Sequence, residues 1–327
     1  MKAKVFAVES IRRMRGGSQS QLMRCSDGEY YVVKFQNNPQ GVRVLANELL
    51  GGLLAKRLGL PVPEVSIIEV DEKLIRHSED MVVQLARGRM PYQSGLCVGS
   101  RYPRNLDLLG NVVPATVYDF LPLGMFHKVD NIADFLGMLV FDSWVGNTDQ
   151  RQVVFVRDEQ NTLHLPYYSY RALMIDEGFC FNACKWDFPP NSKHGLFPTA
   201  NVYAGVSGLE VFELWLNRLE SLIDKNTLEL AAFEIPREWN NGSSGSLDRL
   251  VARLDERRHQ VRDMLSATRK AVPRFFPMWH EQIVTPRKSR SKNRITRWRN
   301  LNQEAMDSLI SRYLRRLAKC SKPVPPL

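Results

Sequence analysis

The sequence contains no apolar run of the roughly 18 residues that a membrane-spanning helix needs. Its first residues, 1–17, have no long apolar stretch before a small-residue cleavage site, so they predict a strand and a turn rather than a secretory signal. We therefore expect a cytoplasmic protein with no membrane partner.

Cysteine is scarce and irregularly placed. The five cysteines are an odd number, and Cys25, Cys97 and Cys320 stand far apart in the chain. Cys180 and Cys184 have the wrong spacing for the common zinc-binding pairs and lack a second pair. The six histidines are also scattered without ligand spacing. This usage predicts free thiols in a reducing compartment and structural histidines, rather than a disulfide framework or a zinc site.

What is present is an ordinary globular composition. Hydrophobic residues make up 44% and aromatic residues 9% of the 327 positions, which excludes a disordered chain. A chain of this length fits one large domain or two lobes. The net charge of +10 is moderate, so it favours phosphate-bearing partners such as ATP without by itself indicating nucleic-acid binding.

The first part of the chain has the pattern of strands around one strong helix. Strands are predicted where β-branched and aromatic residues are enriched, at 3–8, 29–36, 60–70 and 81–86. Apolar residues at helical spacing predict a helix over 44–58, which Gly59 ends. Residues 88–112 are rich in Gly, Pro, Ser and Asn and predict a loop, and 112–124 predict an extended connector.

The remainder is helix-rich with a small two-stranded insert. Helical spacing predicts helices at 131–145, 209–223 and 247–265, and apolar runs predict strands at 153–157 and 172–176. The expected class is α+β. We expect a strand-rich lobe at 1–119, a helical lobe at 120–240 and a helical extension at 241–327.

The segment RGGSQS, between two predicted strands, is a candidate phosphate-binding turn. Gly16 and Gly17 free the backbone to approach a phosphate, and Ser18, Gln19 and Ser20 can donate hydrogen bonds. Taken alone, the segment favours an ordinary hairpin turn. Its functional interpretation depends on the residues that follow it.

Lys34 lies in YYVVKF, a stretch that is otherwise apolar on both faces. A lysine in such a strand must find an anionic partner or reach solvent, and the helix that follows offers Glu48. In kinases a strand lysine holds the α- and β-phosphates and a helix carboxylate orients it. The order of glycine-rich turn, strand lysine and helix glutamate favours this interpretation over a strand-edge lysine that reaches water.

Two carboxylates follow apolar segments at predicted turns. Asp149 lies in DSWVGNTDQR, at the junction of a helix and a short strand, and Asp176 ends the apolar strand of LMIDEG. Such a pair suits magnesium-assisted phosphoryl transfer, with one acid near the attacking hydroxyl and one on the metal. Each residue alone would be an ordinary turn former. Their order downstream of Lys34 indicates a shared site.

At these positions the sequence resembles the HipA-like kinases, within the wider protein-kinase-like fold. The resemblance covers about residues 16–188, and its best-matching stretches are GGSQSQL, YYVVKF, ANELLGGLLAKRLGLPVPE, FDSWVGNTDQR and MIDEGFCF. It implies a two-lobed fold in which Gly16 to Ser20 form the phosphate loop, with Lys34 as the strand lysine and Glu48 as the helix acid. It also implies that Asp149 is the catalytic aspartate and Asp176 the metal ligand.

The resemblance further implies ATP and magnesium as cofactors and a Ser or Thr on a protein as the phosphate acceptor. ATP would lie against the connector Val117 to Leu121, where Tyr118 and Phe120 are the candidate contacts. Arg151, two residues after Asp149, is counted with it as a catalytic candidate.

One departure from the kinase pattern concerns the second metal ligand. Kinase catalytic loops follow D-x-x-x-x-N, and counting from Asp149 reaches Val154, which cannot bind a metal. Gln152 could supply the missing oxygen, or the register could move to Asp142 and Asn147, which have the required spacing. The first option is preferred because Asp142 lies inside an apolar helical pattern. The departure keeps a second interpretation open, a nucleotide-binding pseudokinase.

Residues 286–300 carry seven Lys or Arg, no acid and one Trp. Basic residues around an aromatic suit contact with nucleic acid or phosphate, so a nucleic-acid-associated regulator is a further interpretation. The pattern is more typical of a solvated surface segment.

Overall fold

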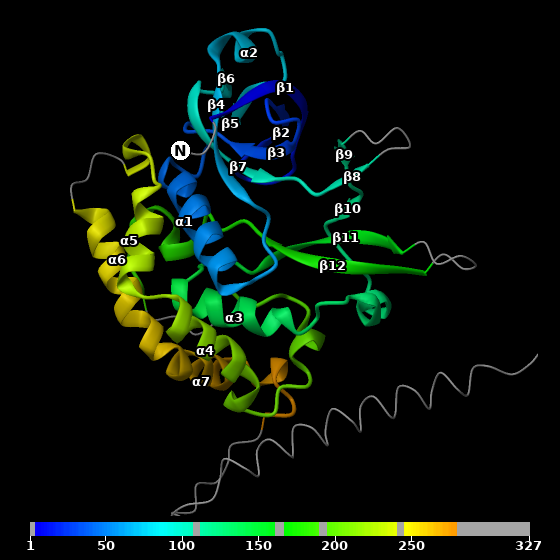
Figure 1. Ribbon diagram of the computed structural model, residues 1–327, viewed down its shortest axis with the longest axis vertical. Helices are drawn as coiled ribbons and strands as arrows, with labels where there is room; N and C mark the ends of the chain where they lie inside the picture. Colours follow the sequence, from blue (N-terminus) through cyan, green and yellow to red (C-terminus); the bar gives the residue numbers. More distant parts are fainter. Residues whose placement is uncertain (1–3, 107–111, 161–166, 190–194, 241–244, 280–327) are drawn as a thin grey trace, which may run out of the picture. The chain divides into compact units, whose positions relative to one another are not determined.

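Five strands from the first third of the chain close into a small barrel (Figure 1). The computed structural model describes residues 4–106, 112–160, 167–189, 195–240 and 245–279, which belong to one compact unit. Around the barrel the order is β1 (Val5–Arg13), β2 (Gln21–Cys25), β3 (Tyr30–Lys34), β7 (Gly95–Arg101) and β4 (Val65–Val70). Neighbouring strands are antiparallel except β1 and β4, whose parallel pairing closes the barrel.

The prediction of a loop over residues 88–112 is wrong. This stretch holds β6 (Gly88–Pro91), β7 and β8 (Arg104–Leu106), and β7 lies between β3 and β4. One of the glycines that suggested a loop, Gly99, has a packing role. A Cβ on Gly99 would come within 2.5 Å of the Ile68 side chain and 3.2 Å of Tyr31, so only a residue without one fits this closed barrel.

The other strands of this region follow the sequence pattern more closely. The strand expected at 3–8 continues to Arg13, and a further strand, β2, separates the two turns. The strand expected at 60–70 begins only at Val65, after the prolines at 61 and 63. Two hairpins complete the region: β5 (Val82–Leu85) with β6, and β8 with β9 (Val112–Pro114). A short helix, α2 (Glu72–Arg76), follows β4.

The helix predicted after β3 is α1 (Arg43–Leu58), and it ends at Gly59, whose φ of 80° is left-handed. It contacts β4 and β7 on one side and helices α4 and α5 on the other, so apolar residues cover most of its surface (Figure 1). Its two buried polar residues, Asn47 and Glu48, must therefore find partners within the protein.

A second sheet follows the barrel. It contains β10 (Val117–Tyr118), β11 (Gln152–Gln160) and β12 (Tyr167–Ile175) in that order, all antiparallel. The two strands predicted here are both present and longer than expected. Between β10 and β11 lies α3 (Asp134–Val145), which starts three residues later than predicted because Asn131 instead bonds the backbone of Ala172.

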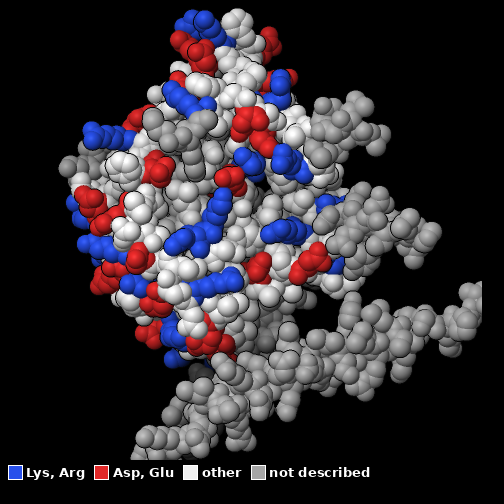
Figure 2. Space-filling view, in the orientation of Figure 1, with Lys and Arg blue, Asp and Glu red and all other residues white. Residues whose placement is uncertain are grey.

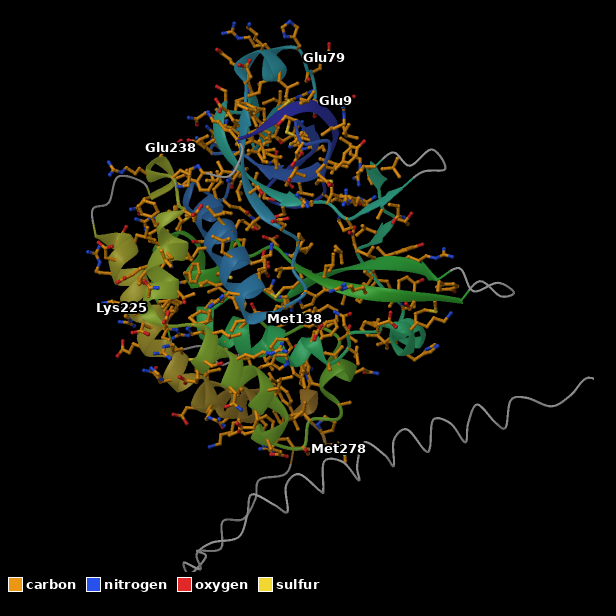
Figure 3. The ribbon with its side chains drawn as sticks, viewed as in Figure 1. Glu9, Glu79, Met138, Lys225, Glu238 and Met278 are labelled. Carbon is orange, nitrogen blue, oxygen red and sulfur yellow. The ribbon has the colours of Figure 1, made fainter. Side chains whose placement is uncertain are left out.

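Helices make up the rest of the described chain: α4 (Glu213–Leu222), α5 (Lys225–Phe233), α6 (Ser246–Arg257) and α7 (Val261–Ala271). The single helix predicted over 247–265 is wrong, since the chain bends at 258–260. The bend lets α6 pack on α5 while α7 packs on α3, which one straight helix could not do. Met138 of α3 is fully buried in this core, whereas Lys225 of α5 is exposed (Figure 3).

The contact between α3 and α4 leads to a stability prediction. A Cβ on Gly137 would overlap the ring of Trp215. Overpacking costs about 1–3 kcal/mol, and the better helix propensity of Ala offsets up to about 1 kcal/mol of that. We expect Gly137→Ala to lower the melting temperature by several degrees. Gly124→Ala is the matched control, because nothing lies within 4 Å of its Cβ. Equal melting temperatures of wild type and Gly137→Ala would contradict this packing.

The structure confirms the α+β class, with a strand-rich first part and a helix-rich second part. The lobe boundaries at 119 and 240 stay predictions. Cys25, Cys97, Cys180 and Cys184 are free thiols, as expected. The basic segment 286–300, Cys320 and three of the histidines (164, 194 and 280) lie outside the described residues. No helix in the described part of the chain is both long and apolar enough to cross a membrane.

Candidate functional site

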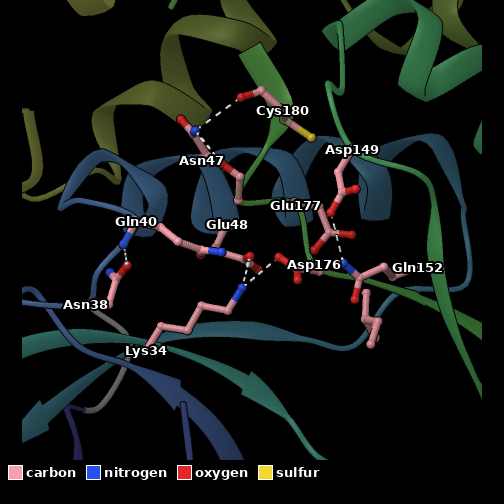
Figure 4. Close-up of polar contacts among 12 residues, drawn as sticks. Lys34, Asn38, Gln40, Asn47, Glu48, Asp149, Gln152, Asp176, Glu177 and Cys180 are labelled. Carbon is pink, nitrogen blue, oxygen red and sulfur yellow. Dashed lines mark hydrogen bonds and ion pairs between the residues drawn. The ribbon is translucent and has the colours of Figure 1, made fainter. Parts of the chain in front are cut away.

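Lys34 is the centre of the candidate site (Figure 4). It is the last residue of β3, and its side chain is almost fully buried. Its Nζ donates to Asp176 Oδ1 at 2.9 Å and forms a second ion pair with Glu48 of α1. Asp176 directly follows β12. Two carboxylates, 14 and 142 residues further along the chain, therefore share one ammonium.

Lys34, Glu48 and Asp176 form a triad in which burial and the neighbouring charges shift each pKa. Burial alone would lower the pKa of Lys34, but Glu48 and Asp176 outweigh it and raise the pKa above its ordinary value. Burial would raise the pKa of Asp176, yet Lys34 lowers it to about 2. Burial raises the pKa of Glu48 although Lys34 opposes the shift. At neutral pH a charged lysine thus faces an ionised aspartate, with a second carboxylate beside them.

The backbone of Asp176 is strained. Its φ of 64° is left-handed, a conformation that costs a non-glycine residue of order 1–3 kcal/mol and persists where the surroundings hold it. One restraint is the bond to Lys34. Another is the close approach of Gly178 to α1, where a Cβ would lie 2.7 Å from Val44 and 3.0 Å from Glu48 Oε1.

The glycine-rich turn joins β1 to β2, and Gly16 has a φ of 117° that favours glycine. The side chain of Gln19 bonds the backbone of Gln84 twice, accepting at 2.7 Å and donating at 2.8 Å. Both serines of the turn are buried. Gln19 therefore connects the turn to β5. Because the Gln19 side chain is engaged and both serines are buried, the backbone at Gly16 and Gly17 is the part of the turn best suited to approach a phosphate.

Asp149 lies on the loop between α3 and β11 with its carboxylate half-buried. Its backbone N donates to Asn147 Oδ1 at 3.1 Å, and its Oδ2 accepts from Gln152 Nε2 at 3.2 Å. Figure 4 shows Asp149, Gln152 and Asp176 on the same side of the site. The structure thus brings both predicted acids to one place.

Arg151 is fully buried and does not point outward. Its Nε donates to Asp142 Oδ2 at 2.8 Å, and its Nη1 donates to Ile175 O at 2.7 Å and lies 3.5 Å from Glu177 Oε1. The guanidinium thereby links α3, the loop of Asp149 and the last residue of β12. In the alternative register, Asp142 is fully buried and bonds Asn147 at 3.0 Å, so its carboxylate has no open side.

Sequence reasoning missed Glu177. Burial raises its pKa to about 8, with the charge of Glu48 adding to the shift and Arg151 opposing it. Its place between Asp176 and a glycine was the available signal. Nothing in the sequence, however, shows that its side chain lies inside the protein, where a Cβ on Gly51 would contact it at 2.8 Å.

The pairing of β11 with β12 bears on the missing metal ligand. Gln152 lies opposite Ile175, next to Asp176, whereas Val154 lies opposite Leu173. Alternate residues of a strand share a face, so Gln152 and Val154 point to the same side of β11. Gln152 is the nearer of the two to Asp176 in this register, and it carries an amide oxygen.

The connector is fastened to the second sheet. Val117 and Tyr118 pair with β11, and the ring of Tyr118 meets the edge of Tyr170 with centroids 5.8 Å apart. Phe120 is 74% exposed. A nucleotide contact of Tyr118 or Phe120 stays a prediction.

Within the described ranges, no three His, Cys, Asp or Glu side chains are grouped as a self-sufficient metal site. Magnesium does not need one, because it usually binds one or two carboxylates together with waters and substrate phosphates. The side chain of Asp176 is 22% exposed and that of Glu48 only 2%. Asp176 is therefore the carboxylate of the triad that a cation can best reach.

Comparison with known proteins gives the class of this chain. A sequence profile described as HipA-like kinase matches residues 7–271. The chain therefore belongs to the HipA-like kinase family, a family of kinase-type phosphotransferases, and the resemblance seen in its motifs is confirmed. A comparison with curated proteins gives no significant match.

Several solved structures are similar at low identity. HipA of Shewanella oneidensis MR-1, in a complex with HipB and operator DNA, is 13% identical over 80% of this chain and 67% of its own, with a TM-score of 0.47. The Helicobacter pylori proinflammatory kinase CtkA is 15% identical over 83% and 99%, with a TM-score of 0.45. A Golgi casein kinase with Mn/ADP bound is 10% identical over 82% and 73%, with a TM-score of 0.40. The family assignment rests on the sequence profile alone.

Proposed function

We propose that this chain is an ATP- and magnesium-dependent phosphotransferase. The observation that carries the proposal is the convergence of Glu48 and Asp176 on the buried ammonium of Lys34. Kinases bind nucleotide phosphates with a strand lysine that a helix carboxylate orients, beside a metal-binding aspartate. Membership of the HipA-like kinase family supports the same reaction class.

The residues present fit a magnesium nucleotide. Lys34 would hold the α- and β-phosphates, the backbone of Gly16 and Gly17 would approach them, and Asp176 would hold the metal. When bound, magnesium would neutralise phosphate charge and orient the transferred group. Asp176, which is ionised beside Lys34, would supply the carboxylate oxygen that the cation needs.

Asp149 is proposed as the general base. Its half-exposed carboxylate would take the proton of an acceptor hydroxyl, on a Ser or Thr of a protein by family resemblance, as that oxygen attacks the phosphate. Arg151 is proposed as a positioning residue, because its buried guanidinium ties the loop of Asp149 to Ile175 O, directly before Asp176.

A second candidate is a nucleotide-binding pseudokinase. Val154 favours it, since it removes the oxygen that usually binds a second magnesium ion. Gln152 opposes it, because its amide lies beside Asp149 and offers a substitute oxygen. Nucleic-acid binding stays a prediction from residues 286–300. On the face in Figure 2, basic and acidic side chains of the described residues are interspersed, as on a solvated surface.

Transfer can be tested by intact-mass measurement of the protein, with ADP release, after incubation with Mg-ATP. We expect phosphorylated product or ADP from the wild type and a loss of about a hundredfold or more in Asp149→Asn, since a general base contributes about 10²–10⁴-fold. Asp263→Asn, at an exposed position on α7, is the matched control. A wild type that Mg-ATP stabilises but that produces neither ADP nor phosphoprotein would instead identify a pseudokinase.

A further inference from the structure

Asn47 precedes Glu48 on α1 and is fully buried. Its side chain makes four hydrogen bonds to residues far along the chain. Nδ2 donates to the carbonyls of Gly178 (2.8 Å), Cys180 (3.1 Å) and Ala183 (2.9 Å), and Oδ1 accepts from Trp186 Nε1 (2.7 Å). All four partners lie in the segment 178–186, which begins two residues after Asp176. One side chain of α1 therefore bonds this segment at four of its residues.

The backbone of the 178–186 segment needs such support. Phe181, Asn182 and Ala183 have positive φ angles of 59°, 58° and 53°, and Trp186 has one of 56°. Non-glycine residues rarely adopt these angles, and they keep them only where the surroundings over-determine the conformation. The turn also directs three carbonyls at α1, where each buried acceptor needs a donor. The two N–H groups of the Asn47 amide serve these three carbonyls, with one N–H shared between two of them.

Other contacts hold the outer side of the same segment. The guanidinium of Arg43 lies 4.5 Å from the ring centre of Trp186 and donates to Cys184 O at 2.9 Å. Cys184 Sγ contacts Gln40 O at 3.1 Å. These residues are partly exposed, whereas Asn47 is the buried link on the inner side.

We propose that Asn47 is a positioning residue for the phosphoryl-transfer site, which fixes the 178–186 segment on α1 and thereby holds Asp176 at Lys34 and Glu48. The inference rests on the proposed function. Because Asn47 and Glu48 are consecutive, α1 places the partner of Lys34 and the anchor of the Asp176 segment together. Without the anchor, the left-handed backbone at Asp176 can relax and carry its carboxylate away from Lys34.

The test is a magnesium titration of the wild type and of Asn47→Ala at fixed ATP. Its readout is the shift in melting temperature. We expect Asn47→Ala to need about 10–100-fold more magnesium, the usual effect of removing a group that orients a metal ligand. Stabilisation by ATP in EDTA should remain, because Lys34 and the glycine-rich turn are untouched. Without nucleotide, amide hydrogens of residues 178–186 should exchange faster in the variant.

Two further variants separate positioning from general stability. Trp186→Phe keeps an aromatic ring under Arg43 and removes the indole N–H that donates to Asn47, so it should shift the magnesium requirement in the same direction by less. Its effect should not add to that of Asn47→Ala, because both act on one network.

Asn131→Ala is the matched control. Asn131, in the turn before α3, also contacts a distant strand through two 2.9 Å bonds to Ala172, and its loss should lower the melting temperature without changing the magnesium requirement.

The outcomes are distinguishable. Suppose that the wild type responds to Mg-ATP and that Asn47→Ala and Trp186→Phe both need the same magnesium concentration as the wild type. The positioning role is then overturned while the proposed function stands. A wild type without a metal-dependent response overturns the proposed function and the positioning role with it. If Asn47→Ala does not fold, Trp186→Phe decides the question on the same measurement.

Discussion

Replacing Lys34 by Met should abolish the stabilisation of this protein by Mg-ATP. The ammonium is the cationic group of the site that faces both carboxylates, the buried Glu48 and the partly exposed Asp176. Met has a similar length and no charge, so it cannot hold the phosphates. The variant should also be less stable without ligand, because removing one partner of a buried ion pair costs about 3–5 kcal/mol.

A compensated variant separates these two effects. In Lys34→Met combined with Glu48→Gln, one buried carboxylate is replaced by a neutral amide of the same shape. We expect this double variant to recover much of the melting temperature and none of the response to Mg-ATP. Lys56→Met is the control, because Lys56 is exposed and its 3.2 Å pair with Glu64 is worth about 0–1 kcal/mol.

The measurement is thermal denaturation with and without Mg-ATP. If the double variant is stabilised by Mg-ATP as much as the wild type is, Lys34 does not hold nucleotide phosphates. If Lys34→Met is as stable as wild type without ligand, the buried triad does not have the charges assigned to it here.

Asp176→Asn should remove the magnesium dependence of ATP binding while preserving the fold. Asn tolerates the left-handed conformation that this position requires, with φ of 64°, so the backbone need not move. Lys34 keeps Glu48 as its partner. The variant lacks the carboxylate charge that binds the metal, and metal stabilisation of the transition state is worth several kcal/mol. Turnover should therefore fall by at least about a hundredfold.

The readout is a magnesium titration by calorimetry at fixed ATP, together with ADP release. Gln152→Ala on the same titration tests the substitute ligand: metal affinity should fall if Gln152 supplies the missing oxygen and should stay unchanged if it does not. Normal turnover in both Asp176→Asn and Asp149→Asn would contradict the site and direct attention to Asp142 and Asn147.

The elements of this fold could be predicted where one periodicity dominates. The helix from Val44 to Leu58 has apolar residues at helical spacing and a glycine at its end, and α1 has those bounds within one residue. The barrel strand β7 could not be predicted, because its Gly99 is required by side chains of other strands. Only closure of the barrel brings Ile68 and Tyr31 against Gly99.

The candidate site divides in the same way. The sequence by itself determined the residue types and their order: a glycine-rich turn, Lys34, Glu48, Asp149 and Asp176, with a valine where an asparagine is usual. Local chemistry was enough, since a lysine in an apolar strand and acids at strand ends need explanation wherever they occur. The sequence also determined the family, because a match of residue types in order is what a family profile measures.

Only the tertiary structure decided which of these side chains serve the site directly and which support it. Gln19 bonds the backbone of Gln84, and Arg151 is sealed between Asp142 and Ile175. In the sequence Asn47 is a single amide in a helix and gives no signal of a role. Its four partners in the 178–186 segment are known only from the structure. The physical reason is that a hydrogen-bonding group has many possible partners in an unfolded chain. Burial selects among them, and for Asn47 the selected partners lie more than a hundred positions further along the chain.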